Sequence, residues 1–176
     1  MGFKYAIRSD RSHFLTHTIT GWADLFTRKE LAEIIVNSLN FCIQSKGLEV
    51  YAWCLMPSHL HMIANSNKPD ASLSDIMRDF KKFTSKAIID CIQTTLESRK
   101  EWLIKLFAHG EGAFQVWQEG MHPEELFTAK FTKQKLDYIH ENPVAAGLVY
   151  EPQHYVYSSA IDYYTGQKGL VDVVLI

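Results

Sequence analysis

The feature that most constrains the fold is a pair of apolar segments separated by only two residues. Residues 48–56 (LEVYAWCLM) carry aliphatic and aromatic side chains that are typical of a largely buried strand. Pro57 and Ser58 follow, and residues 59–65 (HLHMIAN) resume a strand-like pattern. Strands joined by so short a connection pair with each other in antiparallel orientation, so the sequence predicts a β-hairpin.

Helical patterns lie on both sides of this hairpin. Apolar side chains recur at helical spacing over residues 28–45, and Gly47 supplies a stop. A second helix is expected to begin at a cap residue, Ser72 or Ser74, and to run toward residue 96. Both helices are amphipathic, so each is expected to pack one face on the sheet.

Three further segments complete the pattern. Residues 13–20 are rich in threonine and partly alternating, and residues 114–118 alternate, so each predicts a strand. Residues 128–141 predict a last helix. It is expected to end near Asn142, because Pro143 disfavours helix for the residue before it.

The predicted order is strand, helix, strand, strand, helix, strand, followed by one more helix. This is the order of the ferredoxin-like βαββαβ unit. We therefore expect an α+β fold with an antiparallel sheet, helices on one face, and an appended C-terminal helix that carries Tyr138. No linker, repeat or low-complexity stretch divides the chain, so residues 1–176 are expected to form a single domain.

Composition excludes several classes of protein. Apolar residues make up 47% and charged residues 22%, which is unlike disordered or collagen-like chains. No apolar run approaches the roughly 18 residues of a membrane span, and residues 1–10 lack the pattern of a signal peptide. Cys42, Cys54 and Cys91 are odd in number and form no CxxC pair, which indicates reduced thiols and a cytoplasmic location.

The charge balance limits nucleic-acid binding to a local surface. Eighteen Lys and Arg against 20 Asp and Glu give a net charge of −2, whereas nonspecific polyanion binding needs a basic field. The best candidate is one arc of the second predicted helix, formed by Arg78, Lys81, Lys82 and Lys86. The alternative is an ordinary solvated helix face.

The first candidate for chemistry is the pair His59 and His61. Residues i and i+2 of a strand share a face, so both imidazoles point the same way. Two adjacent neutral imidazoles can hold a divalent ion and leave positions open for substrate oxygens. The alternative is two half-buried histidines that bond to backbone groups.

The second candidate is Tyr138 with Asn142. Four residues apart on a helix, they lie on one face and one turn from each other. A phenol can act as a nucleophile, and an amide oxygen can be a hard metal ligand. Here too a structural alternative exists, since tyrosine often packs on helix faces and asparagine before proline is a common helix end.

Taken together, these motifs resemble a known family. The segments MPSHLHMI (56–63), VWQEGMHP (116–123), YIHENPVAAGLV (138–149) and YSSAIDYY (157–164) are similar, in this order, to those of REP-associated tyrosine transposases. These belong to the single-tyrosine HUH superfamily of IS200-like transposases. The resemblance implies that His59, His61 and Asn142 bind the metal and that Tyr138 is the nucleophile.

The resemblance also implies an activity, which is cleavage and rejoining of single-stranded or hairpin DNA through a 5′-phosphotyrosine. Imidazole suits manganese better than magnesium, so use of Mg²⁺ or Mn²⁺ is expected, with Mn²⁺ binding more tightly. The protein is expected to act as a monomer or homodimer. His140 projects away from Tyr138 and is expected to be structural, which leaves His122 and Glu141 as candidates for the general base.

Two alternatives remain open at this stage. One is a catalytically silent protein of the same fold that binds hairpin DNA. The other is an RRM-like RNA-binding module, which has the same element order but needs aromatic residues on its strands that HLHMIAN does not supply.

Overall fold

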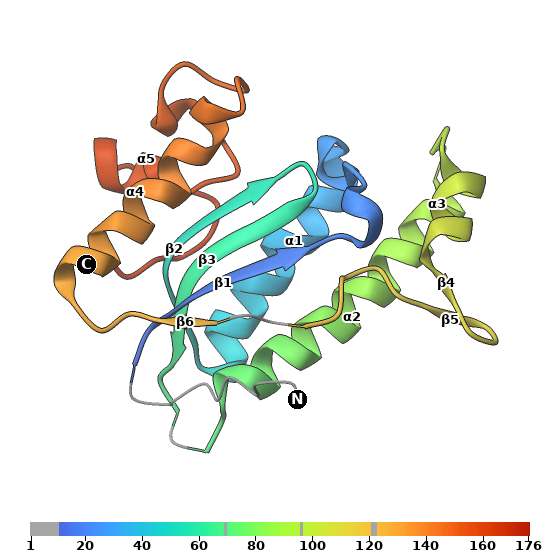
Figure 1. Ribbon diagram of the computed structural model, residues 1–176, viewed down its shortest axis with the longest axis horizontal. Helices are drawn as coiled ribbons and strands as arrows, with labels where there is room; N and C mark the ends of the chain where they lie inside the picture. The colour runs from blue at the N-terminus through green and yellow to red at the C-terminus, as the bar shows by residue number, and fades with distance from the viewer. Residues whose placement is uncertain (1–10, 69, 96, 121–122) are drawn as a thin grey trace.

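The computed structural model describes residues 11–68, 70–95, 97–120 and 123–176. The elements around the predicted hairpin are β1 (His13–Thr18), α1 (Lys29–Phe41), β2 (Leu48–Met56), β3 (His59–Ser66) and α2 (Leu73–Thr94). They are followed by α3 (Lys100–Phe107), β4 (Ala108–His109), β5 (Ala113–Phe114), β6 (Glu124–Glu125), α4 (Ala129–Ala145) and α5 (Ala160–Thr165) (Figure 1). Within these ranges no helix combines the length and apolar character that crossing a bilayer requires.

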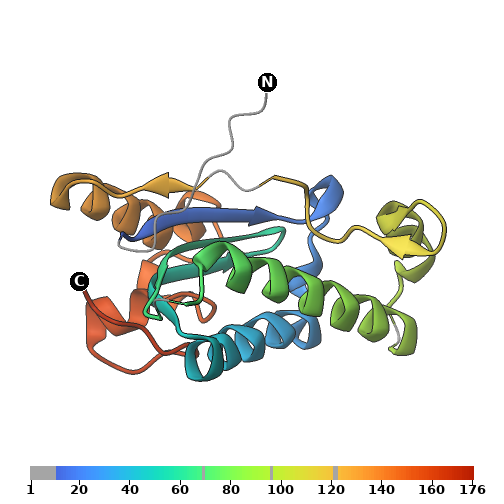
Figure 2. The same cartoon turned by 90° about the horizontal axis from the view of Figure 1, so that it is seen from below.

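The main sheet has four strands in the order β2-β3-β1-β6, and all neighbouring strands are antiparallel. This is the strand order of the ferredoxin-like fold, with β6 in the place of its fourth strand. Figure 2 shows α1 and α2 on one side of the sheet and α4 on the other. The expected fold class, including the appended helix that carries Tyr138, is therefore confirmed.

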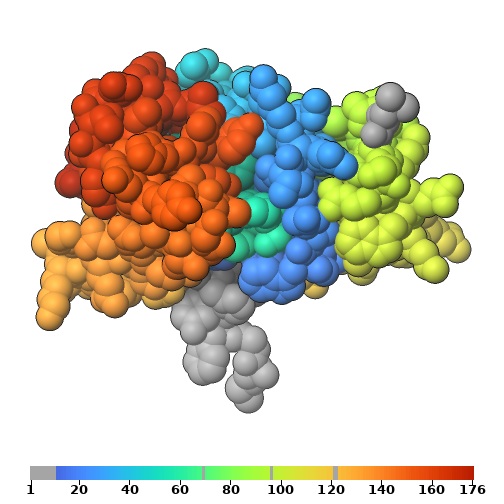
Figure 3. Space-filling view, turned by 90° about the horizontal axis from the view of Figure 1, so that it is seen from above, coloured from blue at the N-terminus to red at the C-terminus, as the bar shows by residue number. Residues whose placement is uncertain are grey.

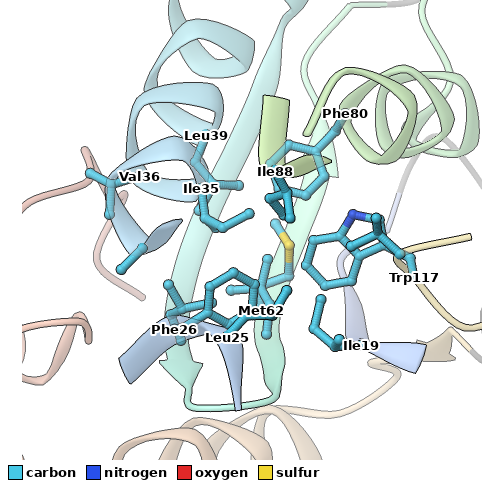
Figure 4. Close-up of a cluster of buried hydrophobic side chains, with 14 of the residues drawn as sticks. Ile19, Leu25, Phe26, Ile35, Val36, Leu39, Met62, Phe80, Ile88 and Trp117 are labelled. Atoms are coloured by element: carbon cyan, nitrogen blue, oxygen red, sulfur yellow. The ribbon is translucent and has the colours of Figure 1, made fainter. Parts of the chain in front are cut away.

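The larger core lies between the sheet and helices α1 and α2. It joins alternate residues of the strands to the apolar faces of both helices, as the helical spacing predicted (Figure 4). A bulge at Tyr51 in β2 shifts the alternation, so that Val50 before it and Trp53 after it both face this core. Ser72 rather than Ser74 caps α2, because its Oγ accepts a hydrogen bond from the Asp75 N–H at 3.1 Å.

The prediction for residues 114–118 was wrong in detail. Residues 113–114 pair with 108–109 in a separate two-stranded sheet, and Trp117 forms only an isolated bridge with Ile19 beyond the end of β1. The fourth strand of the main sheet is instead the short β6. Residues 114–118 still lie beside the end of β1, because the Thr20 N–H donates a hydrogen bond to the Val116 carbonyl at 2.8 Å.

The predicted end of the last helix was also wrong, because α4 continues through Pro143 to Ala145. Proline lacks an N–H, so it removes one hydrogen bond to the residue four positions earlier. The Ala146 N–H donates to the Asn142 carbonyl at 3.0 Å, so the last turn closes after the proline. Asn142 therefore lies inside the helix, one full turn beyond Tyr138.

Candidate active site

Three rings from two elements meet on the face of the sheet that α4 covers. His59 and His61 alternate with the buried Leu60 in β3, and their ring centroids lie 4.6 Å apart. The ring of Tyr138 lies above them on α4, with its centroid 5.3 Å from that of His61. The strand and the helix thus bring together the tyrosine and the two histidines that the sequence singled out.

This site is close to the surface. Figure 3 shows the end of the β2–β3 hairpin as a narrow strip between the C-terminal third of the chain and the residues that follow β1. Tyr138 is 49% exposed, whereas His61 is 5% exposed. A large substrate can therefore reach the phenol while the neighbouring imidazole stays out of water.

Hydroxyl groups hold both imidazoles through Nδ1. Thr16 is opposite His61 in the antiparallel register, and its Oγ1 lies 2.9 Å from His61 Nδ1. The Oγ of Ser58 lies 3.1 Å from His59 Nδ1. When Nδ1–H donates to the hydroxyl, the lone pair of Nε2 is free to bind a metal.

The Nε2 atom of His61 gives a test of whether a metal fits. It is buried and has no hydrogen-bond partner among the residues that the structure describes. Buried polar atoms usually have a partner, so an orphan in this position needs an explanation. A divalent ion held by the two imidazoles would explain it, and the residues present fit such a group.

Burial also keeps the histidines in the form that binds metal. It lowers the pKa of His59, and it lowers the pKa of His61 to about 3, with smaller contributions from the positive charges of His59 and Lys135. Both rings are therefore neutral at pH 7. A neutral imidazole binds a metal without first losing a proton.

The third predicted ligand, Asn142, lies one turn after Tyr138 and is partly exposed. Residues four apart share a helix face, so the amide is on the same side of α4 as the phenol. The described part of the chain contains no group of three or more His, Cys, Asp or Glu that could hold a metal. Among the described residues, the amide of Asn142 stays a candidate for the third ligand.

Phe14 and Lys135 are neighbours of the site that were not predicted. Phe14 stacks on His61 at a centroid distance of 5.6 Å and touches the edge of Tyr138 at 5.9 Å. The Nζ of Lys135 lies 4.4 Å from the Phe14 ring centroid and 2.9 Å from a carboxylate oxygen of Glu124. Lys135 precedes Tyr138 by three residues, so helical spacing could have found it.

The position of α4 depends on a buried hydrogen-bond network. His140 Nε2 lies 2.9 Å from Ser159 Oγ, which accepts a hydrogen bond from the Trp53 N–H at 3.0 Å. Burial lowers the pKa of His140 to about 4. The expected structural role of His140 is confirmed, because the ring connects the tyrosine helix to β2 through the segment before α5.

Two tyrosines near the C-terminus also hold this part of the chain against β2. The hydroxyl of Tyr155 donates to the Leu55 carbonyl, and that of Tyr163 donates to the Tyr51 carbonyl, each at 2.8 Å.

Of the two remaining candidates for the general base, Glu141 is exposed on α4, and His122 lies outside the described residues.

Comparison with known proteins places this chain in a family. The sequence pattern of the family described as "Transposase IS200 like" matches residues 11–121, which is more than half of the chain. This chain belongs to the IS200-like transposase family. No curated protein matches it at a significant level.

One solved structure supports the fold. A REP-associated tyrosine transposase bound to a REP hairpin is similar at a TM-score of 0.68 and 19% sequence identity, over 100% of this chain and 94% of the other. A presumed transposase from Deinococcus radiodurans gives a TM-score of 0.49 and 15% identity, over 81% and 95%. The first supports the fold, and the second is too distant to add to it.

In this IS200-like transposase the predicted basic arc divides into two parts. Arg78 forms ion pairs with Asp75 at 2.6 Å and Asp79 at 3.3 Å. The three lysines, in contrast, line a groove of about 480 Å³ between α2 and the segment that follows β5. Asp90 adds one carboxylate to this groove, and the other residues that line it are Ser85, Ile89, Gln93, Phe114, Gln115, Val116 and Trp117. Lys81 is tied there by a bond from Nζ to the Gln118 carbonyl at 3.1 Å.

Proposed function

We propose that this transposase nicks single-stranded DNA and transfers the strand through a 5′-phosphotyrosine on Tyr138. The observation that carries the proposal is the 5.3 Å centroid distance between Tyr138 and His61. The nucleophile comes from a helix and the metal-binding candidates come from a strand about 80 residues earlier. Their meeting around a buried Nε2 atom without a partner among the described residues favours catalysis over ordinary packing.

His59, His61 and Asn142 are the residues that would hold a divalent ion, Mn²⁺ or Mg²⁺. When bound, such an ion withdraws charge from a non-bridging phosphate oxygen and favours displacement at phosphorus. Thr16 and Ser58 orient the two rings through Nδ1, which leaves the Nε2 lone pairs for the metal.

The reaction on the protein itself is a displacement at phosphorus. The Tyr138 oxygen attacks and loses its proton, the new bond to phosphorus forms, and the bond to the 3′ oxygen breaks. The leaving oxygen takes up a proton and becomes a 3′-hydroxyl. Because the phosphotyrosine keeps the energy of the phosphodiester, a second 3′-hydroxyl can reverse the step and rejoin DNA without ATP.

A positive charge lies beside the rings of the site. The ammonium of Lys135, held by Glu124, lies over Phe14, whose ring contacts both His61 and Tyr138. A cation in a partly buried site stabilises the negative charge of a phosphate more strongly than it would in water. We propose that Lys135 acts in this way during the attack.

We further propose that Lys81, Lys82 and Lys86 contact the phosphates of the DNA strand along their groove. Lys82 and Lys86 are exposed, and among the described residues neither forms an ion pair. Arg78 is the weakest member of the predicted arc, because two carboxylates already neutralise it. A groove with two or three lysines gives a chain of net charge −2 the local basic surface that it needs.

The proposed substrate is a single strand that carries a hairpin, as in the similar structure, whose protein is bound to a REP hairpin. That similarity extends over the whole chain, which supports a single domain of residues 1–176. A monomer or a homodimer is compatible with a site that takes all its proposed residues from one chain.

The deciding experiment compares the wild type with Tyr138→Phe on a library of end-labelled hairpin oligonucleotides with Mn²⁺. Nicking is expected only for the wild type, with a DNA adduct on Tyr138 identified by mass spectrometry. Tyr164→Phe is the matched control, because Tyr164 is similarly exposed at 52% and lies on a neighbouring helix. An adduct on another residue would disprove the assignment, and hairpin binding without nicking would favour the catalytically silent alternative.

A further inference from the structure

An exposed tryptophan extends the row of rings in the active site. The centroids of Tyr138 and His61 lie 5.3 Å apart, those of His61 and His59 lie 4.6 Å apart, and those of His59 and Trp22 lie 5.6 Å apart. Trp22 is 61% exposed, so its indole gains little from burial. The largest apolar side chain of the site therefore presents most of its surface to solvent beside a proposed metal ligand.

The backbone holds Trp22 in an unfavourable conformation. Its φ is +56°, and it is the one non-glycine residue with positive φ in the described ranges. This region is sterically costly for a residue with a bulky side chain, and such strain is concentrated at functional sites. The preceding Gly21 also has positive φ, and a Cβ at that position would lie 3.0 Å from the Leu106 side chain.

Backbone hydrogen bonds fix this strained turn against the active site. The Ile19 N–H donates to the Ser58 carbonyl and the Phe26 N–H donates to the Pro57 carbonyl, each at 2.9 Å. Both acceptors belong to the connection that immediately precedes His59. The turn is also continuous with the basic groove, since Ile19 pairs with Trp117, which lines it.

We infer that Trp22 is the stacking platform for the base of a nucleotide next to the cleaved phosphate. This inference rests on the proposed function, because it assumes that the phosphate lies over Tyr138 and the two histidines. The indole at the end of the same row is then the first aromatic surface that the strand meets on its way to the groove. Stacking of this kind tolerates any base, because every base offers a flat π-face.

The test measures binding of two labelled 12-nucleotide strands by fluorescence anisotropy, with EDTA present so that no cleavage occurs. One strand is oligothymidylate, and the other is abasic at every position. Trp22→Gly should weaken binding of oligothymidylate by roughly 5- to 150-fold and leave the abasic strand unchanged. Trp22→Phe should restore most of the loss, and Trp102→Ala, which removes another exposed tryptophan, should change neither affinity.

The melting temperatures of the variants separate a loss of stacking from a loss of folding. Glycine accepts positive φ without strain, so the melting temperature of Trp22→Gly should be kept or raised. Unchanged binding of oligothymidylate by Trp22→Gly, or an equal loss for both strands, would overturn the inference. Because the assay needs neither metal nor cleavage, a wild type that stacks bases but fails to nick would refute the proposed function alone.

Discussion

The two faces of the main sheet contrast in the way they treat polar side chains. On the face covered by α1 and α2, apolar residues of the strands join one continuous core. His17 is buried there, and neither of its ring nitrogens has a partner among the described residues. On the face covered by α4 a smaller apolar cluster surrounds the functional rings, and hydroxyl groups hold both histidines.

The contrast shows that the two faces of one strand can have different roles, one in stabilising the fold and the other in the candidate active site. In β3 the residues Leu60 and Met62 point into the large core, while His59 and His61 point toward α4. Burial of the first set stabilises the sheet, and the rigid sheet then fixes the second set. Substitutions on the two faces should therefore have different effects, and the following predictions test that separation.

The largest expected effect is on stability, from Leu60→Ala. Leu60 lies between the two histidines in the sequence. Its side chain is fully buried on the opposite face of the sheet. Loss of its side chain should lower the free energy of unfolding by roughly 2–5 kcal/mol, measured by urea denaturation. The Mn²⁺ affinity of the folded protein should stay the same, and a parallel loss of affinity would show that the two faces are coupled.

Thr16→Val should mainly lower the affinity for the metal rather than the free energy of unfolding. It removes the hydroxyl that orients His61, and such changes typically cost about 10- to 100-fold in metal affinity. Isothermal titration with Mn²⁺ measures the effect. Thr18→Val is the matched control, since Thr18 is opposite His59 but the Nδ1 of that ring is bonded to Ser58. Equal effects of both variants would contradict the proposed role of Thr16.

His17→Leu tests the apolar face through its pH dependence. Burial, with a smaller contribution from Lys81, lowers the pKa of His17 to about 3. Between the unfolded value of about 6.5 and this value only the unfolded chain takes up a proton, so stability falls as the pH falls through this window. The leucine variant should lose about 1 kcal/mol less than the wild type between pH 7 and pH 5.5.

Thermal melts at the two pH values check this prediction. At pH 7 the substitution should be neutral or stabilising, because it removes two buried nitrogens that have no partner within the described residues. A destabilised leucine variant at pH 7 would show that the imidazole itself stabilises the fold.

The smallest expected effect comes from the groove, which lies away from both histidines of the site. The double variant Lys82→Gln and Lys86→Gln should reduce the salt dependence of single-strand binding by a log–log slope of about 1.4. Thermal stability should not change. Lys29→Gln with Lys168→Gln removes the same charge from exposed positions elsewhere, and an equal change in slope for that pair would remove the groove from the proposed DNA path.

Much of the fold could be predicted because local patterns determine it. The short connection at Pro57 and Ser58 allows only a hairpin, and the cap at Ser72 starts a helix without help from distant residues. The fourth strand was missed because β6 has two residues, too few for any periodic pattern. The helix end at Pro143 was predicted wrongly because the loss of one hydrogen bond near a helix end does not stop the helix when the following turn still closes.

The candidate site was predicted in part. The alternation in HLH and the helical spacing from Tyr138 to Asn142 are local, so both pairs were visible in the sequence. The contributions of Thr16, Phe14 and Trp22 were not, because they depend on the register of β1 against β3 and on a turn with positive φ. Thr16 faces His61 only because these two strands pair, which no single segment specifies.

By itself, the sequence determined which elements form and which residue types each presents, because helix and strand periods are properties of the local chain. Only the tertiary structure decided that Tyr138 lies over His61, that a hydroxyl from another strand orients that ring, and that an exposed indole ends the row. The physical reason is that these positions follow from packing α4 and β1 on the same strand, a result of burial and hydrogen bonding across the whole chain.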